Sequence, residues 1–150
     1  MSRVQLALNV SNLDEAIDFY SKFFKAEPAK VRAGYANFAI EEPPLKLVLI
    51  ENPSDAGSLN HLGVEVFSTS DVMDATVAFA AAGLSTRVED ETTCCYAVQD
   101  KVWVNGVDEV PWEVYTVLSD SVTANGAGTN EQCCTSDSMS VDVSTDANCC

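Results

Sequence analysis

Six cysteines of this 150-residue chain stand in three adjacent pairs, which are Cys94-Cys95, Cys133-Cys134 and Cys149-Cys150. Neighbouring Cα atoms across a trans peptide lie ~3.8 Å apart, below the ~4.4–6.8 Å that a disulfide usually spans. Such a pair does not readily close on itself. In a reducing compartment it stays a dithiol, which is a soft chelator for thiophilic metals and metalloids. The three pairs therefore predict a thiol function.

The single histidine, His61, opens the second copy of an internal repeat. Residues 61–66 repeat the pattern of residues 5–10, which reads polar, Leu, small, aliphatic, polar, Val. Both runs alternate as strands do, and a capping segment and a helical pattern follow each of them. A pattern that returns after 56 residues predicts two copies of one unit, with Gln5 at the position of His61.

Each copy is expected to contain a strand, a helix and three further strands. In the first copy Ser11 or Asn12 caps the helix, and the strands are residues 3–10, 29–32, 35–40 and 45–50. In the second copy the helix covers residues 70–82 before Gly83, and the strands are residues 61–66, 86–89, 96–104 (a hairpin arm) and 111–117. The fold class is therefore α+β, with two βαβββ units related by a pseudo-two-fold axis around an open, barrel-like cavity.

Four polar residues occupy matching positions on the first and last strands of the two copies, and they are Gln5, Lys46, His61 and Glu113. The match of the last strands comes from Pro44-Leu45-Lys46 against Pro111-Trp112-Glu113. Two units related by a two-fold axis would place these four side chains around the shared cavity.

This duplicated unit resembles the vicinal oxygen chelate superfamily, the fold of glyoxalases and extradiol dioxygenases. The resemblance implies a divalent metal held by Gln5, His61 and Glu113, whereas the Lys46 ammonium cannot ligate. Three protein ligands leave open positions for chemistry. Imidazole, carboxylate and amide oxygen suit iron(II), with manganese or nickel as substitutes. Each residue alone is more often an ordinary hydrogen-bonded strand residue, but their coincidence at repeat positions favours the metal site.

A more specific resemblance, over roughly residues 1–120, is to the organoarsenical carbon–arsenic lyases and the cadmium-induced proteins of actinobacteria. The segments that carry it are residues 34–40, 43–49, 60–65, 92–97, 99–104 and 112–115. It implies that Cys94 and Cys95 bind the trivalent arsenic of the substrate while a non-haem iron uses dioxygen to break the carbon–arsenic bond. Adjacent residues in a regular strand point to opposite faces. Both cysteines can therefore reach one arsenic atom only from a loop or bulge.

The net charge of −15 excludes some partners. Residues 1–118 carry 18 acids against 8 bases, so this surface repels nucleic acid and anionic lipid. The sequence has no run of ~18 apolar residues that would span a bilayer and no signal-peptide pattern, which predicts a cytosolic protein. A vicinal oxygen chelate domain is expected over residues 1–118 (units 1–51 and 59–118). A disordered Ser/Thr/Asp/Cys-rich tail is expected over residues 119–150.

The leading functional hypothesis is an iron(II)-dependent dioxygenase that cleaves methylarsenite or aromatic trivalent arsenicals to arsenite. The alternative is a thiol-rich protein that sequesters cadmium or arsenite without turnover. A thiol-transfer or epoxide-opening enzyme on the same fold would need a glutathione pocket, which the sequence does not reveal. The expected partner is a small molecule, and the sequence leaves both a monomer and a homodimer open.

Overall fold

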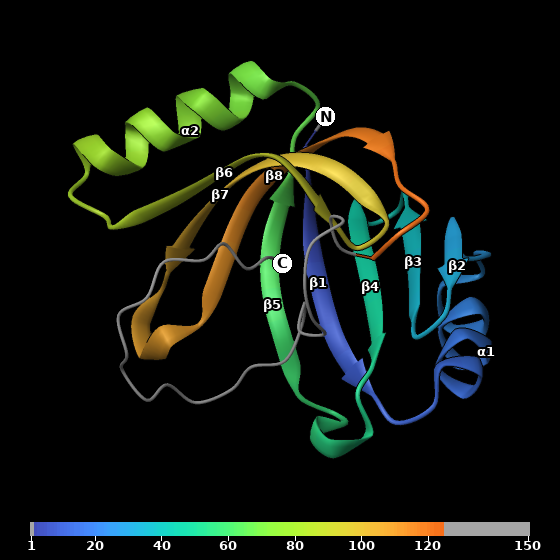
Figure 1. Cartoon of the computed structure of the whole chain (residues 1–150). Helices are drawn as coiled ribbons and strands as arrows, with labels where there is room; N and C mark the ends of the chain where they lie inside the picture. Colours follow the sequence, from blue (N-terminus) through green and yellow to red (C-terminus); the bar gives the residue numbers. More distant parts are fainter. Residues whose placement is uncertain (1, 125–150) are drawn as a thin grey trace.

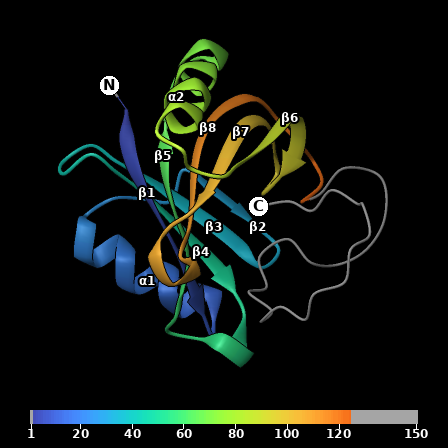
Figure 2. The same ribbon diagram turned by 90° about the vertical axis from the view of Figure 1, so that its left-hand side faces the viewer.

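The computed structural model describes residues 2–124, which form one curled sheet of eight strands and two helices (Figures 1 and 2). The strands follow the order β2-β3-β4-β1-β5-β8-β7-β6 across the sheet. Their bounds are β1 Arg3–Val10, β2 Lys30–Arg32, β3 Tyr35–Ile40, β4 Leu45–Glu51, β5 Leu59–Glu65, β6 Thr86–Cys94, β7 Ala97–Asn105 and β8 Pro111–Asp120. The helices are α1 Leu13–Phe24 and α2 Thr69–Ala81, and single 3-10 turns cover Pro53–Asp55 and Val107–Glu109.

The two βαβββ units meet where β1 pairs antiparallel with β5. In this pairing Gln5 lies opposite Gly63, and Ala7 lies opposite His61. A shift of 56 residues converts each of these pairs into the other, so the register itself has the predicted pseudo-two-fold symmetry. The predicted fold class, an open half-barrel of the vicinal oxygen chelate type, is confirmed.

The last strands of the two units do not pair in the same register. Lys46 of β4 lies beside Gln5 of β1. Glu113 of β8 lies beside Gly63 of β5, which is two residues beyond His61, the counterpart of Gln5. The position that corresponds to Glu113 in the first unit is therefore Val48, which lies beside Ala7. The sequence match that placed Lys46 there is off by two residues. An even shift keeps both residues on the same face, so Lys46 still points into the curve of the sheet.

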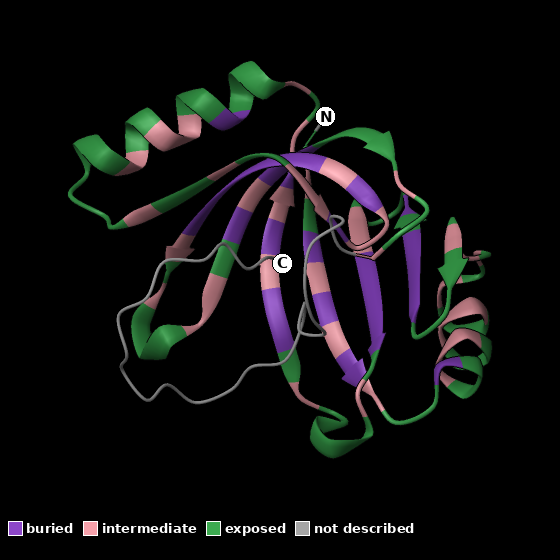
Figure 3. Cartoon of the chain, viewed as in Figure 1, coloured by how far each residue is buried: buried purple, intermediate pink, exposed green. Residues whose placement is uncertain are grey.

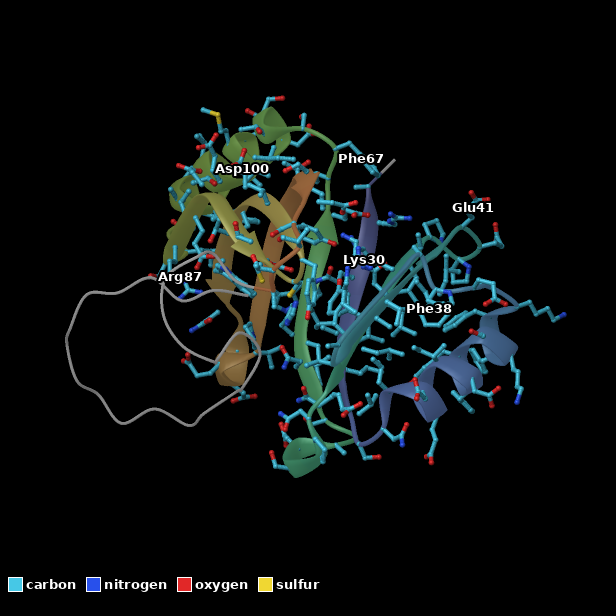
Figure 4. All side chains as sticks on the ribbon, turned by 45° about the vertical axis from the view of Figure 1, so that its right-hand side comes forward. Lys30, Phe38, Glu41, Phe67, Arg87 and Asp100 are labelled. Carbon is cyan, nitrogen blue, oxygen red and sulfur yellow. The ribbon has the colours of Figure 1, made fainter. Side chains whose placement is uncertain are left out.

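Helix α1 begins at Leu13 after the Asn12 cap, whose side chain accepts a hydrogen bond from the backbone of Glu15, as predicted. It packs on the outer face of the first unit, where Phe38 and Leu47 belong to the buried core (Figure 4). Helix α2 buries only Val72 (Figure 3). The outer face of the first unit therefore carries the main hydrophobic core, while the concave face is free to carry polar groups.

Two elements extend beyond their predicted bounds. β6 continues to Cys94, and β8 continues through Ser119 and Asp120, which pair with the start of β7. The expected tail beyond Ala124 lies outside the described residues. None of the described helices is long and apolar enough to cross a membrane.

We expect a chain that ends at Ala124 to unfold within about 2 °C of the full chain, because residues 2–124 include every core cluster described. Thermal unfolding followed by circular dichroism measures the difference. A loss of 8 °C or more, which corresponds to roughly 2–4 kcal/mol for a domain of this size, would mean that residues 125–150 stabilise the fold.

Candidate metal and thiol site

Three potential ligands converge on the concave face at the junction of the two units. The Gln5 amide nitrogen lies 3.0 Å from Nε2 of His61 and 2.7 Å from Oε1 of Glu113. His61 Nε2 and Glu113 Oε1 lie 3.4 Å apart. All three side chains are buried although each is polar. The structure thus brings together the three residues that the sequence analysis named as a metal site.

Gly63 makes this convergence possible. It lies between Gln5 on β1 and Glu113 on β8. A Cβ atom at this position would lie 3.0 Å from Cγ of Glu113 and 3.3 Å from both Cβ and Nε2 of Gln5. Glycine therefore leaves the space in which the two side chains approach each other, and its role here is steric.

A hydrogen-bond chain fixes the imidazole of His61. Its Nδ1 lies 2.7 Å from the side-chain oxygen of Asn60, which can only accept, so Nδ1 carries the proton. The Asn60 amide in turn donates to Asn9 at 3.0 Å. This arrangement leaves the lone pair of Nε2 directed toward Gln5 and Glu113, as metal-binding histidines require.

Glu113 is held ionised by a buried cation. The ammonium of Lys101, which is 1% exposed, lies 3.0 Å from Oε2 of Glu113. Burial by itself raises the pKa of Glu113, but its neighbours, the Lys101 ammonium foremost, outweigh burial and hold the pKa at about 2. Oε2 makes no hydrogen bond of good geometry despite this ion pair. The carboxylate is therefore available as an anionic ligand at neutral pH.

The orientation of the Gln5 amide depends on Tyr115. The phenol donates to Oε1 of Gln5, and this leaves Nε2 facing His61 and Glu113. A metal ligand would require the amide oxygen on that side, which a 180° rotation of the amide provides while Tyr115 then accepts from Nε2. Burial, together with Glu65, raises the pKa of Tyr115 well above its usual value, so the phenol keeps its proton.

The cysteine pair lies at a tight turn between β6 and β7. Cys94 is the last residue of β6 and pairs with Ala97, so Cys95 and Tyr96 alone form the turn. Both have positive φ values, 52° and 62°, as a type I′ hairpin requires. For non-glycine residues this conformation costs about 1–2 kcal/mol each. The loop predicted from the strand geometry is present.

The turn brings the two sulfurs to one side. The Sγ atoms of Cys94 and Cys95 lie 3.1 Å apart, well beyond the ~2.05 Å of a disulfide, so they are not bonded to each other. Cys94 is buried, whereas Cys95 is half-buried. Binding of one arsenic atom by both sulfurs requires both thiols in the reduced state.

Hydrogen bonds to the segment around Lys30 and Ala33 and to Ser121 stabilise this turn. The carbonyl of Tyr96 accepts from Nζ of Lys30 at 3.1 Å and from the backbone of Ser121 at 2.9 Å. The Tyr96 phenol donates to the carbonyl of Ala33 at 3.1 Å. Lys30 and Ala33 belong to the first unit and the cysteines to the second, so the turn bridges the two units over the concave face.

Two connected cavities contain the site. An inner chamber of about 20 Å³ is lined by the three convergent residues together with Val48, Cys94, Cys95, Lys101 and Tyr115. An outer basin of about 220 Å³ lies against it. The residues that line both are Tyr35, Lys46, Cys95 and Gln99. The inner chamber has room for about one water-sized molecule, and larger groups must occupy the basin.

The sequence analysis did not identify the residues that support the ligands. Lys101, Tyr115, Asn60 and Gly63 act through contacts between strands that are distant in the sequence. Of these four residues, only Gly63 is marked in the sequence, because the second copy has glycine where the first copy has Ala7. No group of three or more His, Cys, Asp and Glu side chains meets within residues 2–124, because the third donor of this site is an amide.

The chain belongs to the Glyoxalase/Bleomycin resistance protein/Dioxygenase superfamily, whose family model matches residues 3–114. A "Cadmium-induced protein CadI" of Mycobacterium bovis is 63% identical over 82% of this chain and 81% of that protein. A "Trivalent organoarsenical cleaving enzyme" of Thermomonospora curvata is 54% identical over the full length of both chains. Within the superfamily the chain belongs to the family of these relatives, which confirms the resemblance.

Among solved structures, an extradiol ring-cleaving dioxygenase from B. fuscum superimposes with a TM-score of 0.59. It is 18% identical, and the match covers 79% of this chain and 33% of that one. At this identity the likeness supports the fold and not the reaction.

We expect Gly63→Ala to weaken iron(II) binding at least tenfold with little loss of fold, because the new methyl group would displace Gln5 or Glu113. Isothermal titration with iron(II) under nitrogen measures the affinity, and circular dichroism checks the fold. Gly106→Ala is the matched control, since its φ of −78° suits alanine and it lies outside both cavities. Unchanged affinity in Gly63→Ala would contradict the steric role.

Proposed function

We propose that this protein cleaves the carbon–arsenic bond of trivalent organoarsenicals, such as methylarsenite and aromatic arsenicals, and releases arsenite. The observation that supports the proposal most directly is the position of Cys95. Its side chain lines both the inner chamber with Gln5, His61 and Glu113 and the outer basin. The two cysteines and the three proposed metal ligands line one cavity, as capture of arsenic followed by cleavage would require.

The donor set fits iron(II). Gln5, His61 and Glu113 would hold it through one amide oxygen, one imidazole nitrogen and one carboxylate, with manganese or nickel as substitutes. The position in the first unit that corresponds to Glu113 is the apolar Val48, so this strand offers no fourth ligand and coordination positions stay open. Bound iron(II) would supply activation of dioxygen, and the balanced reaction is CH3As(OH)2 + O2 → HCHO + As(OH)3.

The protein's own residues would prepare and hold this site. Asn60 keeps the proton of His61 on Nδ1, and Lys101 keeps Glu113 ionised. Tyr115 holds the Gln5 amide. Such supporting contacts typically change metal affinity by 10–100-fold. They keep His61 and Glu113 in the protonation states that bind a cation, so that rotation of the Gln5 amide is the one rearrangement that binding requires.

The reduced cysteines would bind the substrate through its arsenic. Arsenic(III) is soft and prefers thiolates, whereas iron(II) in this set has oxygen and nitrogen ligands, so the two do not compete for donors. Two thiolates hold the arsenic in one orientation and make attack on the carbon–arsenic bond an intramolecular event. The strained turn at Cys95 and Tyr96 is consistent with this role, since such strain is concentrated at functional sites.

Sequestration of cadmium or arsenite without turnover is the second candidate, and the cadmium-induced relatives favour it. The two functions differ in their products. Cleavage predicts arsenite and formaldehyde from methylarsenite in air with iron(II) and neither product without oxygen. Sequestration predicts stoichiometric binding with no product under either condition.

We expect His61→Ala and Glu113→Gln each to lower iron(II) affinity more than about 100-fold and to abolish turnover, because each removes one of three proposed ligands. Glutamine is used at 113 because alanine would leave the Lys101 ammonium buried without its partner, at a cost of about 3–5 kcal/mol. Gln5→Ala is expected to be milder, since a neutral amide is the weakest ligand.

Iron content of the purified variants and arsenite release measure these effects. Gln99→Ala is a matched control for iron binding, because it removes a buried amide from the same cavity without touching the triad. Wild-type iron content in His61→Ala or Glu113→Gln would eliminate the proposed metal site.

We expect Cys94→Ser and Cys95→Ser each to reduce arsenite release at least 100-fold while iron(II) content stays at the wild-type level. A serine hydroxyl is too hard and too weakly acidic to replace a thiolate on arsenic. Arsenite release by reduced protein and iron content are measured on the same samples, with Cys133→Ser as the control. Wild-type release by either variant would contradict capture by the pair. Joint loss of iron and activity would favour the sequestration reading.

A further inference from the structure

Basic side chains gather around the two cavities although the protein is strongly acidic. Among residues 2–124, the cavities are lined by four of the eight bases but by only three of the 19 acids. The bases are Arg3, Lys30, Lys46 and Lys101, and the acids are Glu65, Glu113 and Asp120. Lys30 forms an ion pair with Asp120 and Lys101 one with Glu113. The excess positive charge therefore lies at the remaining three residues, which are Arg3, Lys46 and Glu65.

These three residues form a triad with one surplus positive charge. Lys46 Nζ lies 2.8 Å from Oε1 of Glu65, and Nε of Arg3 binds Oε2 of the same carboxylate. Two cations thus share one anion. Burial raises the pKa of Glu65, but the two cations outweigh it and lower the pKa, so Glu65 is ionised. The side chains of Arg3 and Lys46 remain 23% and 13% exposed, and both line the basin.

The basin is where a large organic group on arsenic must lie. An arsenic atom bound to Cys95 would lie at the junction of the two cavities, with the carbon–arsenic bond at this junction and the organic group extending into the basin. The inner chamber, of about 20 Å³, cannot hold an aromatic ring, whereas the basin of about 220 Å³ can. Lys46 lines both cavities and lies 5.4 Å from the centre of the Tyr115 ring, at the same junction.

We infer that the Arg3–Glu65–Lys46 triad is an anion subsite that selects trivalent arsenicals whose organic group carries an acidic substituent, such as a carboxylate. The inference rests on the proposed function. A surplus charge between low-dielectric walls attracts an anion more strongly than the same charge in water. The chain as a whole carries a net charge of −15, so this positive group lies in an acidic protein. Lys30, which is labelled in Figure 4, also lines the basin, but Asp120 neutralises it.

The test compares 4-carboxyphenylarsenous acid with phenylarsenous acid on the full chain loaded with iron(II). Tris(3-hydroxypropyl)phosphine at equal concentration serves as the reductant for both, because it is neutral and brings neither a carboxylate to the subsite nor a thiol to the arsenic. The measured quantity is the ratio of kcat/KM for the carboxylated substrate to that for the neutral one. We expect a ratio of about five or more for the wild-type chain. Lys46→Met makes the triad neutral and should lower the ratio about tenfold.

Glu65→Gln adds one positive charge and should raise the ratio, so the two variants move it in opposite directions. Lys22→Met is the matched control, because it removes an exposed lysine paired with Asp18 on α1, remote from the cavities, and should leave the ratio unchanged. A ratio within twofold of wild type in both Lys46→Met and Glu65→Gln would overturn the subsite. Opposite shifts cannot result from partial unfolding, which keeps the test valid if one variant is unstable.

A binding measurement separates this inference from the proposed function. Titration of the iron-free, reduced chain with both arsenicals, followed by tryptophan fluorescence, gives a ratio of dissociation constants that does not need turnover. The same variant dependence without any cleavage would support the subsite and refute the lyase. Cleavage of phenylarsenous acid with no dependence on Lys46 or Glu65 in either assay would refute the subsite and leave the lyase standing.

Discussion

The close antiparallel approach of β1 and β5 about the pseudo-two-fold axis is the constraint on which the site depends. It places Gln5 opposite Gly63 and His61 opposite Ala7, so each polar side chain faces a small residue of the other unit. A larger residue at Gly63 would push Gln5 and Glu113 apart. The two units therefore cannot pair in this register with bulky residues at these positions and still bring three polar groups together.

The duplicated units have diverged into different tasks. In the first unit, α1 covers the outer face with most of the described core, and Val48 fills the position that corresponds to Glu113. In the second unit, α2 buries little, but its strands supply His61, Glu113, Lys101 and both described cysteines. The first unit thus provides stability and the second most of the polar chemistry. Because Val48 occupies the position that corresponds to Glu113, the first unit offers an apolar side chain there in place of a fourth ligand to the proposed metal.

The sequence predicted those parts of the structure that depend on local pattern. Alternation and caps located β1 and α1. The repeat grouped Gln5, His61 and Glu113 with Lys46, and the family resemblance then singled out the first three as metal ligands. The register of β4 and β8 could not be read in this way, because the matching prolines at 44 and 111 suggested a pairing that differs by two residues. Side-chain partners such as Lys101 with Glu113, or Asn60 with Asn9, arise only from long-range pairing and leave no local signal.

Electrostatic balance links the site to the rest of the molecule. A buried carboxylate is unfavourable without a partner. The two that line the cavities, Glu65 and Glu113, each pair with a cation, whereas the buried Asp100 accepts hydrogen bonds from Thr69 and from the backbone of Glu91. Glu113 needs only Lys101 because a divalent metal would supply further positive charge. Glu65 is not a proposed metal ligand, yet it pairs with two cations, although one would neutralise its charge. Stability alone does not require the second cation, and its position at the cavity junction is what a substrate anion would need.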